Sequence, residues 1–123
     1  MTTLFISDIH ISENHQEINK QFINFISTLG NNINALYILG DLFEYWLGDD
    51  DHNPIFKETE KALKKLSKRN IPSYFIHGNR DFLIGGEFAK RANIEILPDP
   101  SIIKLYGDKI LLSHGDIFCT DDM

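Results

Sequence analysis

Four short motifs, each directly after an apolar run, constrain the fold of this 123-residue chain more than any other feature. The apolar runs are rich in Ile, Leu, Phe and Tyr, as expected for buried strands. The motifs are Asp8-Ile9-His10, Gly40-Asp41, Gly78-Asn79-Arg80-Asp81 and Ser113-His114-Gly115-Asp116. Because ligands of open α/β sheets gather outside the carboxyl ends of the strands, the motifs predict one shared site.

The donor atoms in these motifs indicate a divalent metal. Carboxylate and amide oxygens and imidazole nitrogens suit a cation such as Mn²⁺ better than one that prefers thiolates. Asp8 and His10 are two residues apart, so on an extended backbone their side chains point the same way and can share an ion. Asp41 offers a carboxylate that can bridge two ions, Asn79 a carbonyl oxygen and His114 an imidazole nitrogen. Two ions about 3.5–4 Å apart form a template for hydrolysing phosphate esters.

Two neighbours of these donors have more than one interpretation. Arg80 presents a planar guanidinium suited to phosphate oxygens, and the alternative is a surface ion pair with Asp81. His77 lies on the strand before Gly78, where we expect a core or supporting role rather than a metal ligand.

Composition excludes several classes of function. The net charge of −6 argues against broad electrostatic binding to nucleic acid. No apolar run approaches the length of a membrane-spanning helix, and no basic segment followed by an apolar one opens the chain, so we expect no span and no targeting peptide. Cys119 is the single cysteine and cannot form an intrachain disulfide, which fits a reducing cytoplasm.

Apolar periodicity predicts alternating strands and helices, which indicates an α/β sheet covered by helices. Helical spacing predicts helices over residues 16–29, 54–69 and 86–92. Besides the strand before Asp8, we expect strands at 35–39, 73–76, 94–97, 102–105 and 109–112. The last two are joined by a turn at Tyr106-Gly107-Asp108.

Half of the chain's twelve Lys and Arg residues lie between Lys57 and Arg69. One interpretation is a contact with anionic lipid head groups. The other is a solvated helix face, which we favour because Glu58 and Glu60 interrupt the cluster.

The order of the four motifs resembles the signature of the calcineurin-like metallophosphoesterase superfamily, which runs D-x-H, G-D, G-N-H and H. The resemblance covers nearly the whole chain. Arg80 stands where most of the superfamily has a His that is often credited with protonating the leaving group. Together with Trp46 and Gly48-Asp49-Asp50-Asp51, this substitution is similar to the subfamily of UDP-2,3-diacylglucosamine pyrophosphatases in lipid A biosynthesis of Gram-negative bacteria.

The resemblance implies an α/β fold, a metallophosphoesterase-type β-sheet sandwich flanked by helices. It also implies two divalent ions, Mn²⁺ in this subfamily, and hydrolysis of the pyrophosphate bond of UDP-2,3-diacylglucosamine. Water attacks the α-phosphorus, and the products are UMP and 2,3-diacylglucosamine 1-phosphate (lipid X). Such enzymes are peripheral proteins of the cytoplasmic face of the inner membrane, so an inner-membrane surface is an implied partner.

The resemblance also implies roles for individual residues. The implied metal ligands, with Asp41 bridging, are Asp8, His10, Asp41, Asn79 and His114. The implied catalytic residues are Asp41, Asn79 and His114. The implied substrate contacts are Asn79, Arg80 and Asp122.

Two parts of the pattern of this pyrophosphatase family do not occur in this sequence, namely a later G-H-x-H block and the helices that form a cap over the acyl chains. We therefore expect residues 1–123 to be the N-terminal portion of a metallophosphoesterase catalytic domain. Two alternatives stay open. One is another calcineurin-like phosphodiesterase or phosphatase, and the other is an inactive, truncated fragment that binds metal.

Overall fold

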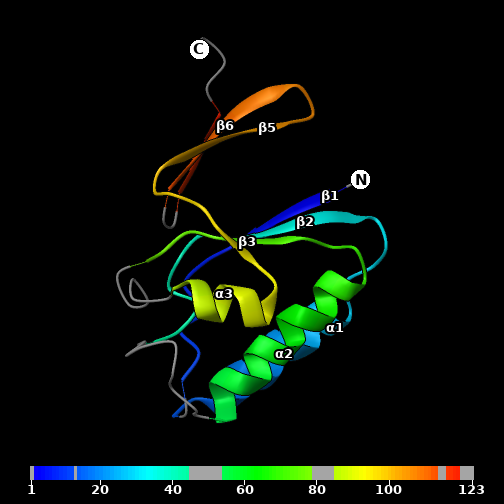
Figure 1. Ribbon diagram of the computed structural model, residues 1–123, viewed down its shortest axis with the longest axis vertical. Helices are drawn as coiled ribbons and strands as arrows, with labels where there is room; N and C mark the ends of the chain where they lie inside the picture. Colours follow the sequence, from blue (N-terminus) through cyan, green and yellow to red (C-terminus); the bar gives the residue numbers. More distant parts are fainter. Residues whose placement is uncertain (1, 13, 45–53, 79–84, 114–115, 120–123) are drawn as a thin grey trace.

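The computed structural model describes residues 2–12, 14–44, 54–78, 85–113 and 116–119, the last four by their backbone. Ten elements follow one another along the chain (Figure 1). They are β1 (Thr2–Ile6), α1 (Gln16–Ser27), β2 (Ile33–Ile38), α2 (Pro54–Lys68), β3 (Ser73–Phe75), α3 (Gly86–Ala92), β4 (Glu95–Ile96), β5 (Ser101–Leu105), β6 (Asp108–Ser113) and β7 (Asp116–Cys119).

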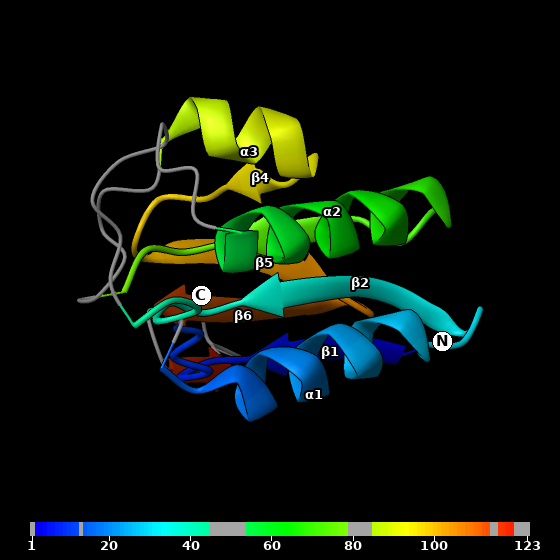
Figure 2. The same ribbon diagram turned by 90° about the horizontal axis from the view of Figure 1, so that it is seen from below.

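The strands form two sheets that pack face to face. The first is parallel in the order β1-β2-β3-β4, and the second is antiparallel in the order β5-β6-β7. Figure 1 shows the three helices below the parallel sheet and the antiparallel sheet above it. Turned by 90°, the same layers show α1, α2 and α3 side by side across one face of the parallel sheet (Figure 2). The expected α/β sandwich with flanking helices is confirmed.

The central strand β2 is buried on both faces, which explains its nearly unbroken apolar sequence. Leu36 and Ile38 belong to the core between the parallel sheet and the helices, with Phe22 of α1 and Leu63 of α2. Alternate residues of the strand face the other sheet, where Tyr37 forms part of a second core. The strand therefore anchors two layers, and its carboxyl end cannot shift without disturbing both.

Element positions agree with the sequence prediction, and the ends differ by a few residues. The helix predicted to reach residue 29 ends at Ser27, because Thr28 folds back and its hydroxyl donates to the carbonyl of Phe25 at 3.0 Å. Arg69, the residue directly after α2, supports this end, since its guanidinium donates to the carbonyls of Ser27 and Leu29. These carbonyls lie at the C-terminal end of the helix, where cations are favourable.

The turn between β5 and β6 is tighter than predicted. Leu105 pairs with Asp108, so the loop contains two residues, Tyr106 and Gly107, with φ of 52° and 91°. Two consecutive positive φ values are the signature of a type I′ hairpin turn. The placement of Asp108 in the turn was wrong, because that residue already pairs as the first of β6. The strand β7 was not predicted.

No helix in the described part of the chain combines the length and the apolar character that crossing a membrane requires.

Candidate metal centre

Two loops that follow β1 and β2 run side by side beyond the edge of the parallel sheet. The N–H of Asp8 donates to the carbonyl of Gly40 at 3.3 Å. Further along, the N–H of Ile11 donates to the carbonyl of Leu42 at 2.8 Å. The N–H of Glu44 returns to the carbonyl of Ile11 at 2.9 Å. These bonds continue the pairing of the two strands into the loops, so the polar side chains there have fixed neighbours.

Buried apolar side chains anchor the two loops in the core beside α2 and α3. Ile11, Leu42 and Phe43 have no exposed surface. The ring of Phe43 lies edge-on to the rings of Phe56 in α2 and Phe88 in α3, with centroids 5.0 and 5.7 Å apart. Such aromatic pairs add to the stabilisation from burial. The loops are therefore part of the core on one side and carry polar groups on the other.

Three residues of these loops have a left-handed backbone. Asp8 and His10 both have φ of 57°, and Asp41 has φ of 53°. Asp8 and His10 follow the predicted strand as expected, but the expectation of an extended backbone at the two residues was wrong, because β1 ends at Ile6 and both have a positive φ. Left-handed backbone costs a non-glycine residue about 1–2 kcal/mol, less for Asp, and such strain gathers at functional sites.

The turn nevertheless brings the side chains of Asp8, His10 and Asp41 together. One donor atom from each lies within 4.8 Å of the others. His10 Nε2 is 3.8 Å from Asp8 Oδ1, while Ser7 Oγ donates to Asp8 Oδ2 at 3.2 Å. Two carboxylates and an imidazole in this space are a hard-to-borderline donor set that fits a divalent cation. The residues present therefore fit a metal.

The end of β3 comes close to Asp41 at a glycine. A Cβ added to Gly78 would lie 2.3 Å from Asp41 Oδ1 and 2.4 Å from its backbone nitrogen. No side chain fits there, so glycine lets the third strand end approach the carboxylate. The residue before it, His77, lies edge-on to Phe75 with ring centroids 5.5 Å apart.

Comparison with known proteins places these features in a family. The sequence profile described as calcineurin-like phosphoesterase matches residues 1–123. The chain belongs to the calcineurin-like phosphoesterase family. Members of this family act with divalent metal ions, which the donor set at Asp8, His10 and Asp41 suits.

Three relatives carry the same name, UDP-2,3-diacylglucosamine hydrolase. The protein of Aeromonas hydrophila is 51% identical over 122 residues, which are 99% of this chain and 51% of the relative. That of Stenotrophomonas maltophilia is 52% identical over 123 residues, 100% of this chain and 50% of the relative. That of Yersinia pestis is 50% identical over 122 residues, 99% of this chain and 51% of the relative. The chain spans about half the length of these curated relatives.

The remaining predicted site residues lie outside the described part of the chain. They are Asn79, Arg80, His114 and Asp122. The motif that contains His114 follows β6, a strand of the antiparallel sheet. The first three motifs follow strands of the parallel sheet, whereas the fourth follows a strand of the antiparallel sheet.

One charged neighbour of the donor group was missed by sequence reasoning. Glu44 Oε2 lies 3.3 Å from Nδ1 of His10, the ring nitrogen that faces away from Asp8. The sequence held a usable signal, because Asp41 and Glu44 flank the apolar pair Leu42-Phe43. Burial of such a pair turns the acidic residues on either side of it toward the same exposed edge.

Proposed function

We propose that this chain takes part in the metal-dependent hydrolysis of the pyrophosphate bond of UDP-2,3-diacylglucosamine, giving UMP and 2,3-diacylglucosamine 1-phosphate in lipid A biosynthesis. One observation carries the proposal. The group formed by Asp8, His10 and Asp41, with donor atoms within 4.8 Å, lies in a chain 51% identical to a UDP-2,3-diacylglucosamine hydrolase. A metal-binding group at the strand ends of a phosphoesterase is suited to splitting a phosphoanhydride.

We propose that the chain binds two divalent ions and that both are Mn²⁺. The proposed ligands are Asp8, His10, Asp41, Asn79 and His114. When bound, the ions lower the pKa of a water molecule and offset negative charge on the phosphoryl oxygens. Asp41 has two carboxylate oxygens and can give one to each ion. Its strained backbone and close contact with Gly78 support this central role, because both fix the direction of the carboxylate.

Other residues bind and orient the substrate in this proposal. The guanidinium of Arg80 pairs with pyrophosphate oxygens, and Asn79 and Asp122 contact the substrate beside it. The water oxygen forms a bond to the α-phosphorus, and the bond from that phosphorus to the bridging oxygen breaks. The departing sugar phosphate keeps the bridging oxygen. Asp41, Asn79 and His114 are the residues we propose as catalytic.

The test is release of UMP from UDP-2,3-diacylglucosamine with and without Mn²⁺. We expect metal-dependent release that Asp41→Ala abolishes and that Glu87→Ala, a change at a 79% exposed side chain on α3, leaves unchanged. Mn²⁺-dependent release by Asp41→Ala at the unmodified rate would contradict the assignment. Turnover of simple phosphodiesters in place of the UDP-sugar would point instead to a general phosphodiesterase of the same family.

We also propose that residues 1–123 are the N-terminal portion of a longer catalytic domain. The support is that the relatives extend over about twice the matched length. The intact mass of the protein purified from its own cells tests this. A mass well above 14.2 kDa is expected. A mass of 14.2 kDa would mean that the chain exists alone, and the proposed activity would then require a complementing partner.

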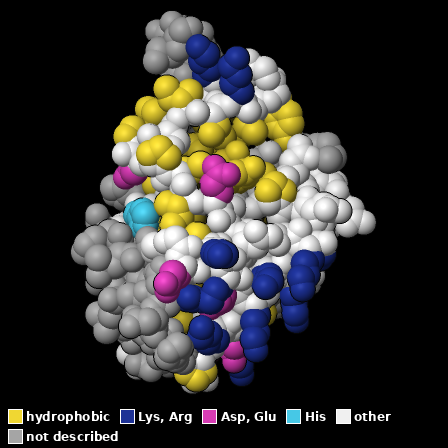
Figure 3. Space-filling view, viewed as in Figure 1, with side chains coloured by type: hydrophobic (Ala, Val, Ile, Leu, Met, Phe, Trp, Pro, Cys, Tyr) yellow, Lys and Arg dark blue, Asp and Glu magenta, His cyan; other side chains and the backbone are white. Residues whose placement is uncertain are grey.

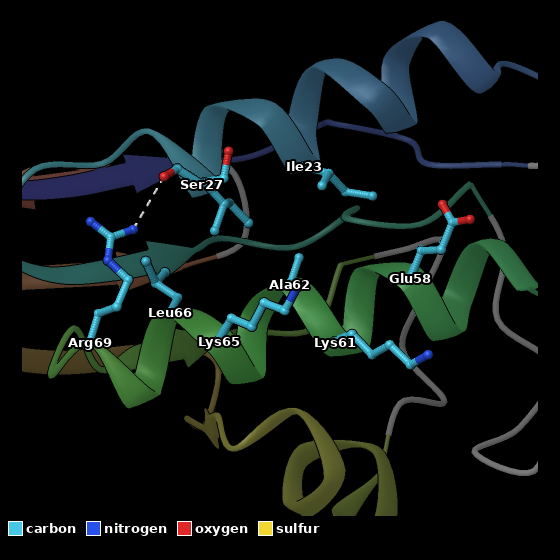
Figure 4. Close-up of a pocket in the computed structure, with 9 residues that line it drawn as sticks. Ile23, Ser27, Glu58, Lys61, Ala62, Lys65, Leu66 and Arg69 are labelled. Atoms are coloured by element: carbon cyan, nitrogen blue, oxygen red, sulfur yellow. Dashed lines mark hydrogen bonds between the residues drawn. The ribbon is translucent and has the colours of Figure 1, made fainter.

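A peripheral contact with the cytoplasmic face of the inner membrane forms part of the proposal. The cations of α2 support it over the solvated helix face that the sequence favoured, since Glu60 is buried while four lysines of the helix are exposed, namely Lys61, Lys64, Lys65 and Lys68. Figure 3 shows Lys and Arg side chains gathered over this helix. Between α1 and α2 lies a groove of about 460 Å³ whose lining includes Ile23. In Figure 4, Lys61 and Lys65 extend from α2 along it. An apolar groove with a basic rim suits anionic lipid, at about 1 kcal/mol per cation.

Co-sedimentation with vesicles that contain phosphatidylglycerol tests this contact. Binding that falls with added salt is expected, and Lys61→Glu with Lys65→Glu should reduce it strongly. The matched control is Lys104→Glu with Lys109→Glu on the second sheet. An equal loss in both pairs would mean that net charge governs binding, and no loss in the α2 pair would exclude this surface.

A further inference from the structure

Glu44 and His10 form a contact that the proposed ligand set does not include. Nδ1 of His10 is buried and makes no well-aligned hydrogen bond, yet Glu44 Oε2 lies only 3.3 Å from it. The other ring nitrogen, Nε2, lies 3.8 Å from Asp8 Oδ1, a carboxylate of the donor group. The two nitrogens therefore face different carboxylates.

A neutral imidazole carries its proton on one nitrogen and accepts on the other. A carboxylate beside Nδ1 favours the proton there, because it can accept that N–H. The Nε2 lone pair then points to Asp8 and Asp41, where a cation can use it. The opposite tautomer would place an N–H in the donor group and repel a cation.

The backbone makes this arrangement rigid. Ile11 follows His10 in the sequence, and its carbonyl accepts the N–H of Glu44 from the second loop at 2.9 Å. The ring of His10 reaches the second loop, where its Nδ1 lies 3.3 Å from Glu44 Oε2. Phe43, which precedes Glu44, is fully buried against Phe56. The backbone position of Glu44 is thus set by the core, and its side chain, 38% exposed, reaches back to His10.

We propose that Glu44 is a positioning residue that holds His10 in the Nδ1–H tautomer, so that Nε2 is available to a divalent cation. Glu44 acts through His10 and contacts neither the ion nor the substrate. The inference rests on the proposed metal site. It adds a residue to that site that lies three positions after Asp41 and is supported by the same buried pair.

Long-range ¹H–¹⁵N correlation NMR of the histidine ring reads the tautomer directly in the metal-free chain at mildly alkaline pH. We expect His10 as the Nδ1–H tautomer in the unmodified chain. Glu44→Met keeps the length of the side chain but removes the acceptor, and should shift the ring toward the Nε2–H form. Glu44→Gln keeps an acceptor oxygen and should restore the Nδ1–H form. Should the Met variant not fold, Glu44→Ala repeats the test.

Calorimetric titration with Mn²⁺ provides the second readout. Loss of a supporting carboxylate costs about 10- to 100-fold in metal affinity, and that loss is expected for Glu44→Met with recovery in Glu44→Gln. The control Glu58→Ala removes an exposed carboxylate from α2 and should change neither readout.

An unchanged tautomer in Glu44→Met, or an equal loss of affinity in Glu44→Gln, would overturn the proposal. If the tautomer responds as expected while UDP-2,3-diacylglucosamine is not hydrolysed, the proposed function fails and the role of Glu44 stands.

Discussion

The backbone N–H of His10 donates to the carbonyl of Asp41 at 3.0 Å, so two proposed ligands from different strand ends share one hydrogen bond. Both residues have a left-handed backbone, with φ of 57° and 53°. The bond couples their positions, because neither loop can move without breaking it. The donor group is therefore organised by main-chain bonding before any cation arrives, which reduces the cost of ordering the ligands on binding.

A substitution at Gly78 tests whether close backbone packing holds Asp41 in the donor group. Gly78→Ala would place a Cβ 2.3 Å from Asp41 Oδ1, so the third strand end or the Asp41 loop must shift. We expect the free energy of unfolding to fall by about 1–3 kcal/mol and Mn²⁺ affinity to drop. Urea denaturation and calorimetric titration measure the two effects. The same change at Gly86, the first residue of α3, meets no atom within 4 Å and should be neutral or slightly stabilising.

How far the sequence predicts this site depends on which interactions form it. The apolar run before Asp41 was enough to predict a strand, because burial on both faces leaves a continuous apolar pattern. The position of Asp8, His10 and Asp41 after two predicted strands also indicated that these side chains come together, as they do. The assumed extended backbone was wrong, because a positive φ at Asp or His depends on bonds to another loop that no local pattern records.

The second sheet was harder to predict for the same reason. The hairpin of β5 and β6 was expected from its local turn, yet β7 exists through pairing with β6, for example Leu112 with Ile117. The contact of Tyr106 with Thr3, whose hydroxyl oxygens are 3.0 Å apart, joins residues 103 positions apart in the sequence. Local propensity carries no information about such contacts.

An ion pair between α2 and α3 should stabilise the helical layer. Glu60 is buried, and its Oε1 accepts from Arg91 Nε at 2.8 Å. We expect Glu60→Ala to lower the free energy of unfolding by about 1–3 kcal/mol, a range that allows for the partial exposure of Arg91. Glu87→Ala removes a longer, exposed contact of the same arginine, at 3.9 Å, and should cost less than about 0.5 kcal/mol. Equal losses in thermal denaturation would refute the distinction.

The left-handed backbone at Asp8 predicts that glycine there changes metal binding far more than stability. Asp8→Gly relieves a left-handed conformation at a side chain that is 62% exposed, so little packing is lost. Strain relief at Asp is less than the about 1–2 kcal/mol of other residues, and it is offset by the added flexibility of the unfolded chain, about 0.4–1 kcal/mol. The free energy of unfolding of the metal-free chain should change by less than about 0.5 kcal/mol while Mn²⁺ affinity falls. Asp108→Gly, on extended backbone at the start of β6, should instead destabilise.

Tyr37 predicts a loss of stability in alkali. Its ring is stacked between Phe5 and Tyr74, with centroids 5.2 and 4.7 Å away, and is nearly inaccessible to solvent. Burial raises the pKa of Tyr37 above 10.0, and the neighbouring Tyr74 and Glu95 raise it further. Between the unfolded and the folded pKa, the folded chain retains a proton that the unfolded chain has lost. Stability contributed by this residue is therefore full below pH 10 and is lost as the pH rises through the folded value.

Tyr37→Phe isolates this contribution, because the ring and its stacking remain while the titrating hydroxyl is removed. Urea denaturation on either side of pH 10 should show a steeper fall in the free energy of unfolding for the unmodified chain than for Tyr37→Phe. Tyr106→Phe serves as the control, since it also removes one tyrosine hydroxyl, from a side chain that is 65% exposed. Identical slopes in Tyr37→Phe and the unmodified chain would mean that the hydroxyl of Tyr37 ionises as readily in the core as in water.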